Sequence, residues 1–166
     1  QTSPLPNVLD TSLKQAFELL RDATKPVILA GGGIKNNGDE ATKHLLALAE
    51  IVNAPCATSP GHGDLIPFNH PLNAGSAGPR GSGIGTQLLR EADVILVLGS
   101  RLGFNTTFYS YENINKNAAI IHCELDENSI GRYFPVAVEI FCDAVGVSKQ
   151  LYQMFKDHKA KAEVAE

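Results

Sequence analysis

Short apolar runs alternate along the chain with glycine-rich turns and amphipathic segments. Five of the runs have the continuous, β-branched character of strands that are buried on both faces of a parallel sheet, and they span residues 26–30, 55–58, 93–98, 119–124 and 138–142. Apolar residues at helical spacing follow or precede them in segments near 13–20, 45–52, 84–91 and 144–155. This alternation of strands and helices predicts an α/β fold. It has a doubly wound, Rossmann-like parallel sheet of five or six strands with helices on both faces.

The two ends of the chain differ in composition from its middle. Residues 1–9 are predicted to form a linker, because Pro4 and Pro6 disfavour helix in the residues before them. Residues 10–155 form the predicted domain, whose first helix is expected to be capped by Asp10 or Thr11. Residues 156–166 are polar and are expected to be an exit linker or a frayed helix end.

Composition narrows the class of protein. The 166 residues are 43% hydrophobic and 19% charged, which suits one domain with a sizeable core. Fourteen basic against 18 acidic residues give a net charge of −4, which argues against a nucleic-acid partner. No apolar run reaches the roughly 18 residues of a membrane span, and no signal peptide opens the chain. Three cysteines, all in apolar runs, indicate buried thiols and a reducing, cytoplasmic location.

The turns that follow the predicted strands are the places where an open parallel sheet binds ligands. Gly31-Gly32-Gly33 follows the first strand, and glycines allow backbone N–H groups to approach a phosphate. The dinucleotide fingerprint is incomplete, since residue 36 is asparagine. The acidic ribose ligand expected after the second strand is also missing, because the residues there are Thr58, Ser59 and Pro60. A standard nicotinamide site is therefore disfavoured, and the glycines equally suit a turn without a ligand.

A second glycine-rich segment spans residues 75–85, and it contains Arg80 and a potential helix cap, Ser82. Arg101 follows the strand at 93–98, where a guanidinium can bind an anion or pair with a nearby carboxylate. Glu124 and Asp126 end the next strand and suit ribose hydroxyls or an adenine amino group. The alternative for Asp126 is that it caps a short helix at 128–131.

The sequence contains no recognisable set of catalytic or metal-binding residues. The five histidines form no H-x-x-x-H pair, the cysteines have no metal-ligand spacing, and no G-x-S-x-G elbow occurs. The chain is therefore predicted to contain no catalytic residue and no metal site. The polar residues in its turns are of the kinds that bind ligands.

The order of these motifs resembles the central domain of thiamine-diphosphate-dependent enzymes, and it is most similar to the acetolactate synthase group. The resemblance covers about residues 10–155 and rests on segments at 25–33, 54–58, 63–67, 70–72, 75–82, 92–101, 121–126, 130–131 and 141–144. It implies a role within a lyase or transferase, either an acetolactate synthase-like carboligase or a 2-oxo acid decarboxylase.

The resemblance also implies partners and cofactors. Full-length members carry this domain between a pyrimidine-binding and a diphosphate-binding domain, and they assemble as homodimers or homotetramers. Thiamine diphosphate and Mg²⁺ are held by those outer domains. The metal-binding G-D-G…N motif is absent here, since Gly63-Asp64 is followed by Leu65. The chain alone is therefore expected to be inactive.

In some members of the group the central domain binds FAD in a largely non-redox role, in others it binds ADP, and in others it binds no nucleotide. The resemblance places nine residues of this chain around such a nucleotide: Gly32, Gly33, Gly78, Arg80, Gly81, Arg101, Glu124, Asp126 and Asp143. Pro79-Arg80 replaces the Met-His of acetolactate synthases, and residues 102–105 lack their acidic pair. Both differences favour a paralogous decarboxylase or carboligase over acetolactate synthase itself. The alternative to an enzyme domain is a free-standing module that binds or senses a nucleotide.

Overall fold

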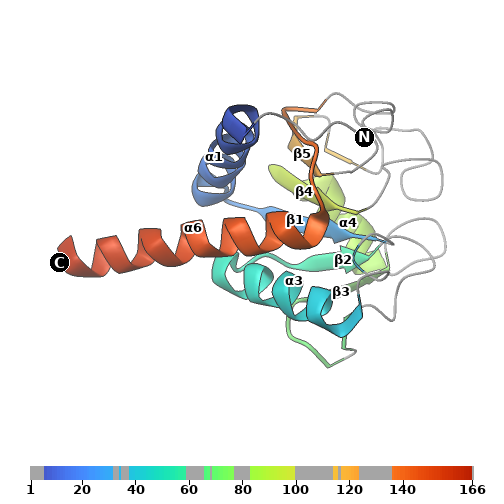
Figure 1. The fold of residues 1–166 in the computed structure, drawn as a ribbon. Coiled ribbons are helices and arrows are strands. Elements are labelled where there is room, and N and C mark those ends of the chain that lie inside the picture. Colours follow the sequence, from blue (N-terminus) through green and yellow to red (C-terminus); the bar gives the residue numbers. More distant parts are fainter. Residues whose placement is uncertain are drawn as a thin grey trace.

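The computed structural model of the chain describes residues 6–31, 34, 38–58, 66–67, 69–76, 83–99, 114–115, 117–123 and 136–165. A six-stranded sheet forms its centre, and every neighbouring pair of strands is parallel (Figure 1). The strand order is β3-β2-β1-β4-β5-β6, which confirms the doubly wound prediction. The strands are β1 (Pro26–Ala30), β2 (Cys56–Thr58), β3 (Asn73–Ser76), β4 (Val94–Leu98), β5 (Ala119–Cys123) and β6 (Val138–Ile140).

The edge strand β3 is the element that the hydrophobic pattern missed. Its sequence, Asn73-Ala-Gly-Ser76, contains no β-branched or large apolar residue. It is ordered by pairing with β2, with a shift of register between Cys56 and Ala57. The Asn73 side chain accepts a hydrogen bond from the Gly75 N–H at 2.8 Å. Backbone pairing therefore forms this strand where side-chain propensity does not.

Four longer helices flank the sheet: α1 (Pro6–Asp22), α3 (Gly38–Val52), α4 (Gly83–Glu91) and α6 (Ala144–Ala165). α1 begins earlier than the expected cap at Asp10 or Thr11, because proline is well suited to the first helical position. α6 continues to Ala165 where a linker or frayed end was expected, and its alanine, lysine and glutamate residues are strong helix formers. None of the described helices is long and apolar enough to cross a bilayer.

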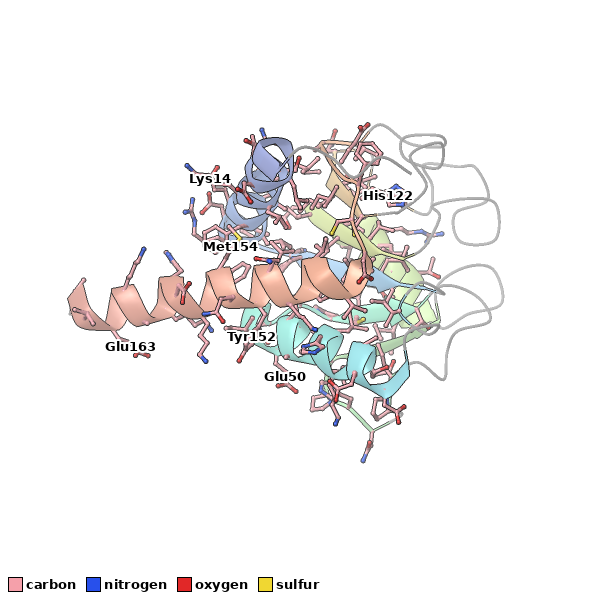
Figure 2. All side chains as sticks on the ribbon, viewed as in Figure 1. Lys14, Glu50, His122, Tyr152, Met154 and Glu163 are labelled. Atoms are coloured by element: carbon pink, nitrogen blue, oxygen red, sulfur yellow. The ribbon has the colours of Figure 1, made fainter. Side chains whose placement is uncertain are left out.

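The two faces of the sheet are covered differently. One core cluster joins α1, α3 and α6 to one face, and α4 packs on the other with Leu89. Leu45 and Leu48 of α3 and Leu151 of α6 are fully buried in this first cluster, and α3 and α6 contact each other. Residues 156–165 of α6 are exposed, and this half of the helix extends beyond the sheet, with Glu163 near its end (Figure 2).

The cysteines occupy two environments. Cys56 and Cys123 are fully buried, as predicted, and the Cys123 thiol donates a hydrogen bond to the Cys142 carbonyl oxygen at 3.1 Å. The prediction that Cys142 is buried in a central strand was wrong. It is half-buried and lies beyond the last residue of β6, which is an edge strand among the described elements.

The amino ends of the central strands are tied together by Asp93, which stands just before β4. Its carboxylate accepts hydrogen bonds from the Thr24 N–H at 2.7 Å, the Thr24 hydroxyl at 3.0 Å and the Lys25 N–H at 2.8 Å. The Asp93 N–H in turn donates to the Lys25 carbonyl oxygen at 3.2 Å. The turn into β1 and the turn into β4 are therefore joined through side-chain and backbone contacts.

Candidate functional site

The carboxyl edge of the sheet is held by backbone hydrogen bonds that continue beyond the strands. The Gly31 N–H donates to the Leu98 carbonyl oxygen at 3.1 Å, and the Gly99 N–H donates to the Cys123 carbonyl oxygen at 3.3 Å. Gly99 has a φ of 64°, which glycine adopts without strain. The chain reverses order between β1 and β4, so the crevice that binds ligands in this fold lies outside these two strands.

Most of the predicted nucleotide-binding residues come from the segments that follow the carboxyl ends of the strands. Eight of the nine lie outside the described residues, and for them the sequence prediction stands as a prediction: Gly32, Gly33, Gly78, Arg80, Gly81, Arg101, Glu124 and Asp126. Gly31 is described, and its N–H is already bonded to Leu98. A phosphate at this turn would therefore have to be met by other N–H groups.

Asp143 is the predicted ligand residue that the structure describes. It is exposed, follows β6, and accepts a hydrogen bond from the Val145 N–H at 3.0 Å through one carboxylate oxygen. Its carbonyl oxygen accepts from the Val147 N–H, so Asp143 caps α6. The second carboxylate oxygen accepts no bond from the described residues. The described part of the cap therefore uses one of the two carboxylate oxygens.

The starts of α3 and α4 differ in charge. Asp39 and Glu40 occupy the first turn of α3, whereas the first turn of α4 contains no acidic residue. The space at the two starts is alike, since a Cβ built at Gly38 or at Gly83, the first residues of α3 and α4, would meet no described atom within 4 Å. A helix N-terminus attracts anions, and carboxylates in its first turn satisfy that preference internally. The start of α4 is therefore the better anion site of the two.

Two further polar side chains near this edge are buried. Thr58, the last residue of β2, is fully buried, and its hydroxyl has no hydrogen-bond partner among the described residues. His122 of β5, labelled in Figure 2, is 2% exposed and lies in register between Val97 and Glu139. No group of three or more metal-ligating side chains occurs in the part of the chain that the structure describes.

No motif in the local sequence predicts a binding role for Thr58. The signal that it offered was its position, because the end of the second strand is where this fold normally meets a ribose. Whether its hydroxyl is bonded depends on the packing around it, which the local sequence does not specify.

Comparison with known families agrees with this architecture. The model of the thiamine pyrophosphate enzyme central domain matches residues 13–151. The chain belongs to this family. The match includes all six strands of the sheet and begins and ends within α1 and α6.

Several curated proteins are similar to this chain. A sulfoacetaldehyde acetyltransferase of Alcaligenes xylosoxydans xylosoxydans is 39% identical over 150 residues, which are 89% of this chain and 24% of the relative. A probable acetolactate synthase large subunit of Methanococcus aeolicus is 37% identical over 153 residues, 89% of this chain and 25% of the relative. The chain therefore spans about a quarter of the length of these relatives.

Proposed function

We propose that the chain is the central domain of a thiamine-diphosphate-dependent lyase or transferase in the group that includes sulfoacetaldehyde acetyltransferase and acetolactate synthase. The observation that carries this proposal is the family match over residues 13–151, together with relatives of both names at 37–39% identity. Their greater length leaves room for the pyrimidine-binding and diphosphate-binding domains, which would be the partners of this domain within a homodimer or homotetramer.

In this proposal the domain supports the reaction without catalysing it. The flanking domains would hold thiamine diphosphate, which stabilises the carbanion formed from a 2-oxo acid, and the Mg²⁺ that binds its diphosphate. The chain lacks the G-D-G…N motif, and its described residues contain no cluster of metal ligands. Its own contribution would be a rigid sheet against which the other domains are positioned.

The second part of the proposal is a nucleotide, FAD or ADP, at the carboxyl edge of the sheet. The support is the strand order, whose switch point lies between β1 and β4, and the acid-free N-terminus of α4. Arg80 and Arg101 would pair with the diphosphate, and Glu124, Asp126 and Asp143 would accept bonds from adenosine. The glycines at 32, 33, 78 and 81 would let the backbone approach.

The flanking reading frame tests the first part of the proposal most directly. A glutamate in an upstream pyrimidine-binding domain and a G-D-G…N segment downstream are expected, and stop codons on both sides would instead favour a free-standing module. The full-length protein, supplied with thiamine diphosphate and Mg²⁺, should turn over pyruvate or sulfoacetaldehyde. The 166-residue chain should show no turnover under the same conditions, and measurable turnover by it would overturn the inactive role.

Calorimetric titration with ADP and with FAD tests the second part. Arg101→Ala should weaken binding about 10- to 100-fold, because a charge-assisted bond to a diphosphate contributes roughly 1.5–3 kcal/mol. Lys159→Ala, on the exposed half of α6, is the matched control and should leave the affinity unchanged. Absence of binding to the folded chain would remove the nucleotide from the proposal and leave the family assignment intact.

A further inference from the structure

Thr58 combines complete burial with a hydroxyl that no described residue hydrogen-bonds. A buried hydroxyl without a partner is costly, and native proteins seldom keep one without a reason such as a ligand or an ordered water. Ser148 provides the contrast within the same protein. It is also fully buried, but its hydroxyl donates to the Ala144 carbonyl oxygen at 2.8 Å.

The position of Thr58 links it to the ligand-binding edge. It ends β2, and its partner in the sheet register is Ala30, the last residue of β1. β4 is the next strand beyond β1, so the switch point lies one to two strand spacings, or about 5–10 Å, from Thr58. The hydroxyl is therefore within reach of a molecule that lies across the carboxyl ends of these strands.

The surroundings indicate what kind of atom the hydroxyl meets. Thr58 lies on the same face of the sheet as Cys56, because side chains alternate along a strand, and that face is covered by α3. α3 starts at the carboxyl edge with Asp39 and Glu40, both exposed. Two carboxylates there repel a phosphate, whereas a neutral hydroxyl, carbonyl or ring nitrogen meets no such penalty.

The geometry points to Thr58 as a ligand-binding residue: its hydroxyl hydrogen-bonds an uncharged polar atom of the nucleotide at the carboxyl edge, directly or through one ordered water. This inference rests on the proposed nucleotide role and adds a residue to it. The ligand then supplies the partner that the protein lacks, and part of its affinity comes from satisfying a group that is left unpaired in its absence.

Thr58→Val is the decisive substitution, because valine keeps the β-branched shape and removes only the hydroxyl. Without ligand the variant should melt about 2–4 °C higher than wild type, since an unpaired buried hydroxyl has been removed. It should bind the nucleotide about tenfold more weakly, measured by titrating the 166-residue chain with ADP and with FAD. Stability and affinity thus change in opposite senses.

Two matched variants separate a ligand contact from a packing effect. Thr58→Ser keeps the hydroxyl and loses a methyl group, so it should melt lower and bind within about twofold of wild type. Ser148→Ala removes a hydroxyl that already has a partner, so it should also melt lower and leave the affinity unchanged.

The outcomes distinguish this inference from the proposal on which it rests. If wild type binds a nucleotide and Thr58→Val binds it equally well, Thr58 is not a ligand residue and the nucleotide role stands. If Thr58→Val melts below wild type without ligand, the hydroxyl already has a partner and the inference is overturned. If wild type binds neither ADP nor FAD, the nucleotide role is wrong and the inference about Thr58 is overturned with it.

Discussion

Asp93 provides the sharpest test of how the sheet is held together. Its carboxylate accepts three hydrogen bonds from Thr24 and Lys25, which precede β1, while Asp93 itself precedes β4. These residues are 68 and 69 positions apart in sequence, so the contact joins two distant turns. Replacing Asp93 by alanine leaves all three donors without the carboxylate.

The expected loss of stability follows from the number and exposure of these bonds. A hydrogen bond to a charged group contributes roughly 1.5–3 kcal/mol when it is shielded from water. Asp93 is half-exposed, so water can replace part of what is lost. We expect Asp93→Ala to lower the free energy of unfolding by about 2–3 kcal/mol. Asp93→Asn keeps one acceptor oxygen and should cost about half as much.

The effect should depend on pH. Partial burial raises the pKa of Asp93, but the Thr24 and Lys25 donors lower it by more, so the pKa lies below its ordinary value of 3.8. The unfolded chain therefore takes up a proton at higher pH than the folded chain does. The stabilisation is complete above about pH 4 and is lost as the pH falls through the lower, folded-state pKa.

Urea unfolding followed by circular dichroism between pH 7 and pH 3 measures both effects. The gap between wild type and Asp93→Ala should be widest at pH 7 and should narrow below about pH 4. Asp157→Ala is the control, because Asp157 is exposed and, among the described residues, accepts a side-chain bond from Gln153 on its own helix. It should cost less than about 0.5 kcal/mol. Equal losses in the two variants, or a gap that ignores pH, would refute the reasoning.

Three further predictions concern other parts of the fold. Burial raises the pKa of the Cys56 thiol to about 12. A thiol reagent should therefore label the half-buried Cys142 first and Cys56 only on unfolding. Rapid labelling of Cys56 in the folded chain would contradict its burial. Leu48→Ala should cost about 2–5 kcal/mol in urea unfolding, because it opens a cavity in the core cluster beneath α3. A loss below about 1 kcal/mol would mean that this part of the core is loosely packed. The pair between the His70 ring and the exposed Glu50 carboxylate, at 3.0 Å, should contribute less than about 1 kcal/mol in a double-mutant cycle, and a value above 2 kcal/mol would show a stronger link.

The sequence predicted the fold where apolar side chains determine it. β1 begins and ends at the predicted residues, and the predicted strand at 93–98 corresponds to β4 at Val94–Leu98, because both are buried on two faces and read as continuous apolar runs. β3 was not predicted, because this strand forms through backbone pairing with β2 and not through its own side chains. The full length of α6 was not predicted either, since its last ten residues have no apolar stripe. Their helix propensity supports the helix there, together with a ring contact between His158 and Phe17.

The candidate site was less predictable than the sheet. The doubly wound parallel sheet and its ligand-binding carboxyl edge followed from the alternation of strands and helices, whereas the order of the strands and the contacts of individual side chains did not. Asp143 shows this, because the family resemblance implied a ligand residue there, whereas the bonds that the structure describes are those of a cap on α6. The unpaired hydroxyl of Thr58 and the bonds of Asp93 depend on residues far away in sequence, which periodicity does not report.

The backbone bonds from Gly31 to Leu98 and from Gly99 to Cys123 have a consequence for the evolution of this domain. They fix the points from which the turns after β1, β4 and β5 depart, and they use only main-chain atoms. Substitutions, insertions and deletions in those turns therefore leave their anchor points in place. Such a frame can exchange one bound molecule for another, or lose it, without refolding, and the same domain can persist in enzymes with different chemistry.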